Sequence, residues 1–277
     1  MQIELIGPSS AGKSTLARGI LQAGREQGID ALMGYELVLK QFRLNWVKGR
    51  TPRVLCVDLM SMLACLVTLR RNFEFYHFTI QTLLRLPVAV AWFEKLNIAR
   101  NVLRKIGIYE IVRHYGSDQQ IVVVDEGTLH TAHHLFVHLS VEPNTSDLST
   151  YVSMVPLPDV VIYVQQDQGV LIKRTLTRGH KRIPNGSYAQ VESFINHASD
   201  TFDKLIRHLE IDGRISVLDN EQDPFTSHDY KNDPTLSMAL NIINSGRDLI
   251  LADHPGPIVH DLKLLEVYTS SNTLCEN

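Results

Sequence analysis

Residues 7–14 read GPSSAGKS, which fits the phosphate-binding pattern GxxxxGK[ST] in full. The motif follows an apolar run, residues 1–6, that predicts a buried strand, and it precedes a helical pattern from Ser14 to Gly28. A glycine-rich turn between a strand and a helix N-terminus directs backbone N–H groups and the helix dipole at an anion. The sequence therefore predicts a binding loop for a nucleoside triphosphate.

The individual positions of this loop have distinct roles. Gly7 and Gly12 permit the tight backbone path, the Lys13 ammonium reaches the terminal phosphates, and the Ser14 hydroxyl can bind Mg²⁺. The nucleotide-binding residues that the motif predicts are Gly7, Ser9, Ser10, Ala11, Gly12, Lys13, Ser14 and Thr15.

Composition and charge argue against a nucleic-acid-binding protein, a membrane span and a cysteine metal site. Of the 277 residues, 44% are hydrophobic and 21% are charged, and the net charge of −3 gives no general attraction to nucleic acid. Residues 54–69 are strongly apolar but short for a membrane span, and they include Asp58, so we expect a buried or subunit-facing helix. Cys56, Cys65 and Cys275 lack metal-binding spacing and no secretory signal precedes them, which predicts reduced thiols in a cytoplasmic protein.

Apolar runs and helical periods alternate along the chain, which predicts an α/β fold whose parallel sheet has helices on both faces. The predicted strands span residues 1–6, 30–35, 121–124, 160–164 and 215–218. The predicted helices span residues 14–28, 53–71, 73–86, 88–115, 127–139, 168–178, 188–210 and 234–245. Residues 37–116 thus form a largely helical insert in a domain over 1–245, and residues 246–277 form a C-terminal extension.

A second candidate site follows the third predicted strand, which ends in Asp125 and Glu126. An acid at this position lies at the carboxyl edge of the sheet, beside the phosphate loop. We expect Asp125 to bind Mg²⁺ together with Ser14, and Glu126 to polarise the attacking hydroxyl or water.

A third candidate site is the basic segment from Arg174 to Arg182, which contains four fixed cations within nine residues. Phosphoryl transfer spreads negative charge over the equatorial oxygens, and arginines stabilise that charge. Arg174, Arg178 and Arg182 are the predicted cations, and Gly179 suits a loop that opens and closes.

With these residues in place, the chain resembles P-loop nucleotide and nucleoside kinases, especially thymidylate kinases and deoxynucleoside kinases, from Met1 to about Ser245. The resemblance rests on the phosphate loop, the acidic strand end and an R-x-x-x-R-G pattern at residues 174–179. It implies a P-loop kinase-type fold, ATP and Mg²⁺ as cofactors, and a basic lid at about residues 174–187. It also implies that residues 220–223 lie over the base, with Asn220 as a nucleotide contact.

The acceptor side departs from that family, because Asp125-Glu126-Gly127 lacks the arginine that both kinase groups carry after the third strand. Arg104 lies at about the family's spacing for an acceptor-phosphate arginine, with Arg100 and Arg113 as alternatives. Glu36 follows the second strand, where deoxynucleoside kinases place a general base. We therefore predict Glu36 and Arg104 as acceptor-binding residues and leave the acceptor's identity open.

Two further clusters have simpler explanations. His130, His134 and His138 recur every four residues on one helix face, a spacing that zinc sites use, but no Cys or Glu partner is evident. We expect ordinary packing there, with acceptor contact by His130 or His134 as the alternative. Residues 70–78 mix cations and aromatics, which we interpret as a helix junction rather than a nucleic-acid site.

The combined prediction is an ATP-dependent kinase of a small acceptor. The predicted catalytic residues are Lys13, Asp125, Glu126, Arg174, Arg178 and Arg182. One alternative is an ATPase that acts as a switch on a protein partner, and another is a non-catalytic nucleotide sensor, which the intact Lys13, Ser14 and Asp125 disfavour. A GTPase is disfavoured because no N-K-x-D motif occurs. The apolar excess of residues 37–116 also suits a homodimer interface.

Overall fold

The computed structural model describes residues 1–87, 90–117, 119–138, 145–180, 182–183, 186–209, 215–220 and 234–253. Within these residues, five parallel strands form one sheet in the order β2-β3-β1-β4-β5. The strands are β1 (Gln2–Ile6), β2 (Ala31–Met33), β3 (Ile121–Asp125), β4 (Val160–Gln165) and β5 (Ile215–Asp219). The predicted parallel sheet is thereby confirmed, and its central strand β1 leads directly into the phosphate loop.

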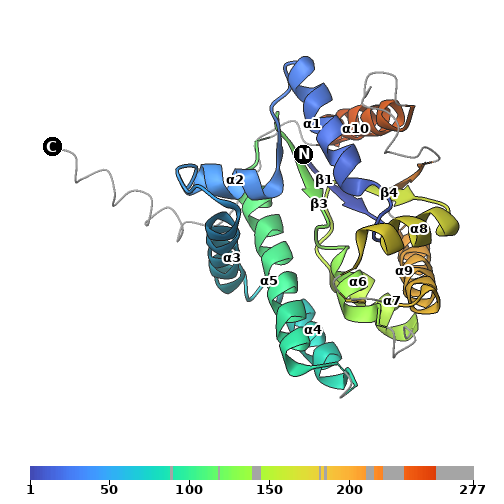
Figure 1. The fold of residues 1–277 in the computed structure, drawn as a ribbon. Helices are drawn as coiled ribbons and strands as arrows, with labels where there is room; N and C mark the ends of the chain where they lie inside the picture. Colours follow the sequence, from blue (N-terminus) through green and yellow to red (C-terminus); the bar gives the residue numbers. More distant parts are fainter. Residues whose placement is uncertain are drawn as a thin grey trace.

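Helices cover both faces of the sheet (Figure 1). They are α1 (Lys13–Glu26), α2 (Gly34–Gln41), α3 (Arg50–Val67), α4 (Phe73–Arg85), α5 (Trp92–Tyr115), α6 (Thr131–Phe136), α7 (Thr145–Met154), α8 (Gln168–Arg178), α9 (Tyr188–Leu209) and α10 (Pro234–Asp253). Helices α2 to α5 form the predicted helical insert between β2 and β3. None of the helices in the described part of the chain is long and apolar enough to cross a membrane.

Several element boundaries differ from the sequence prediction. Strand β2 ends at Met33 and α2 begins at Gly34, inside the predicted strand, because the Glu36 side chain caps the start of the helix. Helix α7 had no prediction, since its ten residues are too few to show a clear period. Helix α10 continues to Asp253, past the predicted start of the C-terminal extension at residue 246, and residues 254–277 lie outside the described part.

Side chains alternate between the two faces of the sheet, as the strand pleat requires. Ile3 and Leu5 of β1 face a core shared with α1 and α10, two helices that lie side by side in Figure 1. Ile6 faces the opposite core, which contains residues of α4, α5, α6 and α9. Glu4 has the same parity as Ile6, and its side chain is fully buried. A carboxyl group therefore lies inside the sheet layer that faces the helical insert.

The helical insert is held by the contact between α3 and α5. A Cβ atom at Gly107 of α5 would overlap the backbone of Ser61, so the two helices approach more closely there than any other residue allows. Away from α5, α3 exposes Leu55, Leu59 and Leu66. That exposed stripe is where a homodimer contact was expected, and the dimer stays a prediction.

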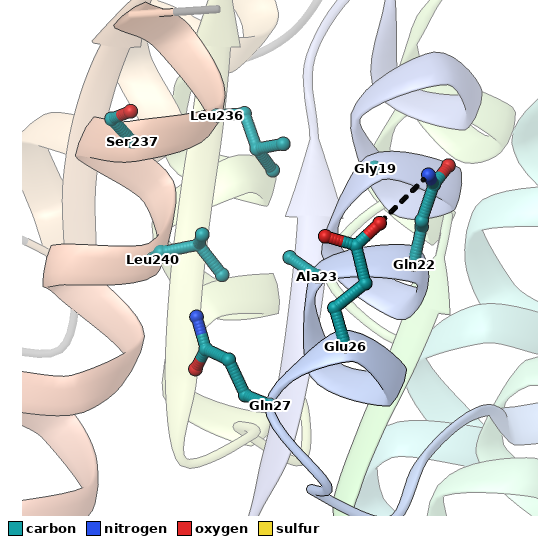
Figure 2. A pocket seen from close by; sticks show the side chains of 8 residues that line it. All are labelled: Gly19, Gln22, Ala23, Glu26, Gln27, Leu236, Ser237 and Leu240. Carbon is teal, nitrogen blue, oxygen red and sulfur yellow. Dashed lines mark hydrogen bonds between the residues drawn. The ribbon is translucent and has the colours of Figure 1, made fainter. Parts of the chain in front are cut away.

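The remaining observations concern thiols, the helix junction and a surface hollow. Cys56 and Cys65 are free thiols, and Cys275 lies outside the described residues. The predicted junction at residues 70–78 is confirmed, because α3 has ended at Val67 and α4 begins at Phe73. A hollow of about 180 Å³ lies between the C-terminal half of α1 and α10, lined by Gln22 and Leu240 among others (Figure 2). Its position is at the opposite end of α1 from the phosphate loop.

Gly107→Ala tests the close contact between α3 and α5. The added methyl group must push the helices apart, so we expect the free energy of unfolding to fall by about 1–3 kcal/mol. Gly169→Ala in α8 is the matched control, since its Cβ would meet a single side-chain atom, Asp167 Oδ1 at 3.0 Å, and no backbone of another helix. That control should be near neutral, because the helix propensity of alanine, favourable by about 1 kcal/mol, offsets the cost of this contact. Urea denaturation curves measure both, and equal effects would contradict the close contact.

Candidate active site

The phosphate loop connects β1 to α1 with a strained backbone. Gly7 has φ +140°, and a Cβ there would come within 2.6 Å of the Val164 carbonyl oxygen on β4. Ser10 has φ 69°, in the left-handed region that costs a non-glycine residue of the order of 1 kcal/mol. At the other end of the loop, Thr15 begins the helical hydrogen bonding by donating its N–H to Gly12 O, at 3.0 Å. The loop is therefore pinned between two strands and a helix start.

Lys13 lies over this loop rather than in solvent. Its ammonium donates hydrogen bonds to Gly7 O at 2.9 Å and Pro8 O at 2.8 Å, and Nζ lies 3.9 Å from Glu126 Oε1. Burial lowers the pKa of Lys13, while the carboxylates of Glu126 and Asp125 oppose that shift. The cation is thus held where a phosphate bound in the loop would meet it.

Ser14 and Asp125, the two predicted metal ligands, are brought together. Ser14 Oγ donates to Asp125 Oδ2 at 2.5 Å, because β1 and β3 are neighbours and their carboxyl ends meet. The second carboxylate oxygen, Asp125 Oδ1, is buried without a hydrogen-bond partner. Burial raises the pKa of Asp125, and the Ser14 hydrogen bond lowers it. An unpartnered carboxylate oxygen beside a hydroxyl fits the oxygen ligands that Mg²⁺ prefers.

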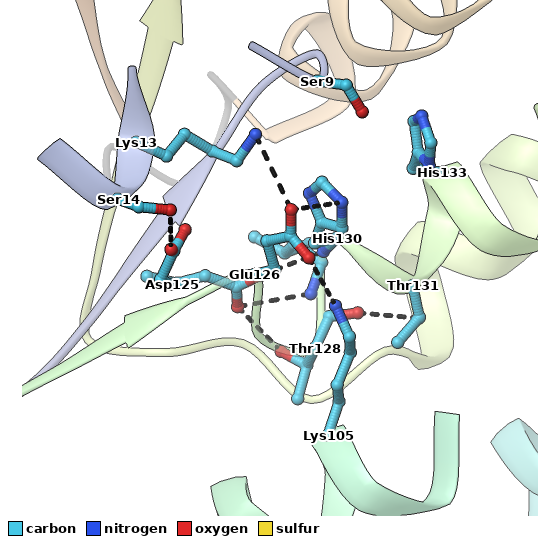
Figure 3. A network of polar contacts seen from close by, with 12 residues as sticks. Ser9, Lys13, Ser14, Lys105, Asp125, Glu126, Thr128, His130, Thr131 and His133 are labelled. Atoms are coloured by element: carbon cyan, nitrogen blue, oxygen red, sulfur yellow. Dashed lines mark hydrogen bonds and ion pairs between the residues drawn. The ribbon is translucent and has the colours of Figure 1, made fainter. Parts of the chain in front are cut away.

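Glu126 lies between two lysines from different parts of the fold (Figure 3). Its Oε1 lies near Lys13 and 3.5 Å from His130 Nε2, and its Oε2 lies 3.7 Å from Nζ of Lys105 on α5. The residue adopts φ 65°, a left-handed conformation that turns the chain sharply after β3. Burial acts to raise the pKa of Glu126, but the Lys105 and Lys13 ammoniums lower it to about 2. The side chain is therefore a carboxylate at all physiological pH values.

Glu4 binds the chain segment that follows Glu126, and two of its hydrogen-bond partners, Thr128 and His130, are labelled in Figure 3. Its carboxylate accepts hydrogen bonds from His130 N at 2.9 Å, Thr128 Oγ1 at 3.1 Å and Leu129 N at 3.2 Å. These bonds fix the turn that follows Glu126. Burial raises the pKa of Glu4 to about 7, against the lowering effect of the backbone N–H groups and Lys105.

Sequence reasoning missed Glu4 and Lys105. Burial lowers the pKa of Lys105, and its Nζ has no hydrogen-bond partner among the described residues. A signal was present for both: Glu4 interrupts an otherwise apolar strand, and Lys105 lies between Val102 and Ile106, which are both buried. A charged residue inside a buried pattern indicates a paired or functional site.

Two members of the basic segment lie at the phosphate loop. Arg174 is buried, and its Nη1 donates to Ser10 O at 3.2 Å. Thr175 Oγ1 donates to Ser10 Oγ at 3.2 Å, which ties α8 to the loop. Arg178, one turn later, is exposed, and its charge contributes to lowering the pKa of Lys13. Arg174 therefore binds the loop itself, and Arg178 lies close enough for its charge to act on Lys13.

Arg182 points elsewhere. Its Nη2 lies 2.9 Å from His138 Nδ1, and its Nη1 donates to His133 O at 3.3 Å. Its Nε lies 3.6 Å from Glu94 Oε1 of α5, and the guanidinium lies 5.8 Å from the ring centre of Phe194. The described contacts of the Arg182 guanidinium are thus with α5, with α6 and His138 just after it, and with α9, and none is with the phosphate loop.

The rest of the predicted lid contacts the loop through His180. Its Nε2 lies 3.2 Å from Ser9 Oγ, and its ring lies 4.8 Å from the ring of Phe194. A bridge between His180 and Ile183 turns the chain back toward α9. Lys181 lies outside the described residues.

Asn220 supports the loop from β5. Its Nδ2 donates to Ala11 O at 2.9 Å, and its backbone N–H donates to Gln165 O at 2.9 Å. A Cβ at Gly12, which has φ +102°, would come within 2.6 Å of Asn220 Nδ2, so glycine is required for this contact. The side chain thus positions the loop, and residues 221–223, predicted to cover the base, lie outside the described part.

The two predicted acceptor residues are not brought into this cluster. Glu36 Oε2 accepts from Met33 N at 3.1 Å and so caps α2. Arg104 Nε lies 3.3 Å from Asp58 Oδ1, and Arg100 Nε lies 3.0 Å from Asp58 Oδ2. Both arginines therefore join α5 to α3.

His130 and His133, at the start of α6, are buried near Glu126, and His134 is partly buried. Burial, followed by the charges of Lys105 and Lys13, holds the pKa of His130 well below its usual value, and burial lowers the pKa of His134 to about 3. His133 packs against Phe202, with ring centres 6.1 Å apart. A ring contact with Phe202 supports the predicted packing of His130, and acceptor contact by His130 or His134 stays a prediction. Glu126 supplies the acidic neighbour that the sequence did not reveal.

No family model and no curated protein matches the sequence. The chain is similar to solved structures of deoxyadenosine kinase from M. mycoides, with bound dATP at 14% identity and a TM-score of 0.46, and with bound dCTP at 15% and 0.43. Each similarity covers 88% of this chain and 100% of that chain. Thymidylate kinase from Ehrlichia chaffeensis matches at 12% identity and a TM-score of 0.40, over 88% of this chain and 98% of that chain.

At these values the likeness carries no conclusion about activity or substrate. The strand order, the loop after the central strand and the acidic end of β3 together give this chain a P-loop kinase-type fold.

Proposed function

We propose that this chain is an ATP-dependent phosphotransferase that moves the γ-phosphate to a small acceptor. The observation that carries the proposal is the Ser14–Asp125 pair with its unpartnered oxygen, directly beside the buried Lys13 ammonium. Phosphoryl transfer requires a loop that binds the phosphates, a carboxylate that binds the metal ion, and a cation on a long side chain such as lysine. They lie together in this chain without any further rearrangement of the fold.

Ser14 and Asp125 would hold Mg²⁺, which on binding neutralises charge on the β- and γ-phosphate oxygens. Lys13 exchanges its hydrogen bonds to Gly7 O and Pro8 O for phosphate oxygens. Arg174 keeps the loop in shape through Ser10 O, and Arg178 contributes charge from solvent.

We assign the acceptor hydroxyl to Glu126 rather than Glu36, because Glu36 is used as a helix cap. The two lysines keep Glu126 ionised, so it accepts a hydrogen bond from the hydroxyl and orients the oxygen. A carboxyl group with such a low pKa is a weak proton acceptor, but the loose transition state of phosphoryl transfer needs little proton abstraction. The P–O bond to ADP breaks as the acceptor O–P bond forms, and the hydroxyl proton passes to water.

The experiment that tests this function is a transfer assay with γ-labelled ATP, Mg²⁺ and a panel of nucleosides, nucleoside monophosphates, sugars and lipid head groups. We expect a labelled acceptor product in equal amount to ADP, with slow phosphate release when the acceptor is absent. Asp125→Asn should reduce transfer about 100-fold and raise the Mg²⁺ requirement, because a neutral amide holds the cation poorly. Asp200→Asn, an exposed acid paired with Lys204 on α9, is the control and should match the wild type.

Phosphate release that is equal with and without every acceptor would show an ATPase instead, including one that switches a protein partner. Normal transfer by Asp125→Asn would remove this residue from the metal site.

Arg178→Ala tests the basic segment. A cation that contacts the phosphoryl group mainly in the transition state affects kcat, so we expect a loss of about 100-fold in kcat with little change in KM for ATP. Lys173→Ala removes one exposed positive charge from a different face of the same helix and should leave both constants unchanged. A rise in KM alone would make Arg178 a ground-state contact, and no change would remove it from the mechanism.

A further inference from the structure

A second cluster of ligand-type side chains adjoins the phosphate site and shares Glu126 with it. Glu126, His130 and His134 are spaced by four residues along the turn after β3 and the start of α6. One ligand atom from each residue lies within 4.8 Å of the others. Figure 3 shows Glu126 and His130 directed at each other. The turn after β3, which is held by hydrogen bonds to Glu4, brings the three side chains together.

The chemistry of these three groups selects a particular class of ligand. Two neutral imidazoles and a carboxylate are donors that Zn²⁺ and similar ions prefer, whereas Mg²⁺ prefers oxygen donors alone. His130 Nδ1 is buried without a hydrogen-bond partner, so that ring is not fully satisfied by the protein. Glu126 is about two-fifths exposed, which gives an ion access from solvent. Three protein ligands also leave an open coordination position.

The geometry points to Glu126, His130 and His134 as a binding site for a divalent transition-metal ion of the zinc class. Lys13 and Lys105 compete for the same carboxylate, so the ion binds by displacing their ammonium groups from Glu126. This competition predicts the direction of each change in affinity: removing a ligand weakens binding of the ion, and removing a lysine strengthens it. Occupation of the site ties up Glu126, so the ion inhibits phosphate transfer, a consequence that rests on the proposed function.

Calorimetric titration of the tag-free, nucleotide-free protein with Zn²⁺ tests the site, and Co²⁺ absorption reports its coordination. We expect one ion per chain in the wild type and no comparable binding of Mg²⁺. His134→Gln should weaken the affinity about 100-fold or more, since it removes a ligand. His133→Gln is the matched control, because His133 is buried on the same helix but is not one of the three ligands.

Lys105→Met gives an independent readout with the opposite sign. The side chain keeps its shape and loses the charge next to Glu126, so we expect Zn²⁺ affinity to rise roughly tenfold. Circular dichroism checks that each variant is folded. If His134→Gln does not fold, the zinc affinity of Lys105→Met alone tests the metal site. Equal affinity of wild type and His134→Gln, or weaker binding by Lys105→Met, would overturn the site.

These measurements use no acceptor and no ATP. Failure of zinc binding therefore leaves the proposed phosphotransferase untouched, and failure of transfer leaves the metal site untouched.

Discussion

The structure around the phosphate loop depends on one carboxylate, Glu126, held between the buried Lys13 and the largely buried Lys105. Lys13 belongs to the phosphate loop and Lys105 to the helical insert, so the ion pairs join the two halves of the fold. Removing an ammonium from water costs several kcal/mol unless an opposite charge is close. Each lysine therefore requires Glu126, and the left-handed turn after β3 is the backbone strain that places it there.

This arrangement has a consequence for how the site responds to nucleotide. A phosphate bound as proposed would attract Lys13 away from the loop carbonyls and compete with Glu126 for the same cation. Lys105 then remains as the partner that keeps Glu126 ionised. The loop itself is held independently, by Arg174 at Ser10 O and Asn220 at Ala11 O. Nucleotide binding can thus change the charges at the acceptor side without changing the loop.

Local patterns predicted the phosphate side of this site, and long-range packing decided the rest. The loop, the apolar strands and the acid after β3 follow from neighbours in the sequence, so Ser14 and Asp125 were found and do meet. The sequence prediction chose Arg104 and missed its neighbour Lys105. Successive residues of a helix point in directions about 100° apart, so the two side chains face different parts of the fold. That rotation turns Arg104 to Asp58 on α3 and Lys105 to Glu126.

Other differences have the same origin. Glu36 matched a family position but its carboxylate is used by the backbone at the start of α2. Arg182 continued a basic run, yet its described contacts are with Glu94 and His138. No sequence pattern shows which of several cations a buried acid will meet, because that choice depends on how α5 packs against the sheet.

The most direct test is the titration of the Glu126 carboxyl carbon by ¹³C NMR, assigned by comparison with Glu126→Gln. In the wild type the two ammoniums hold the pKa of Glu126 at about 2, so no titration should occur from about pH 8 to about pH 3. In Lys105→Met one of the two lowering charges is lost while burial still raises the pKa of Glu126, so the carboxyl should titrate inside this range. Lys95→Met is the control, because it removes an ammonium of α5 that binds Leu86 O at the end of α4, and it should behave as the wild type. A wild-type Glu126 that titrates near its ordinary value, or equal shifts in the two lysine variants, would contradict the account.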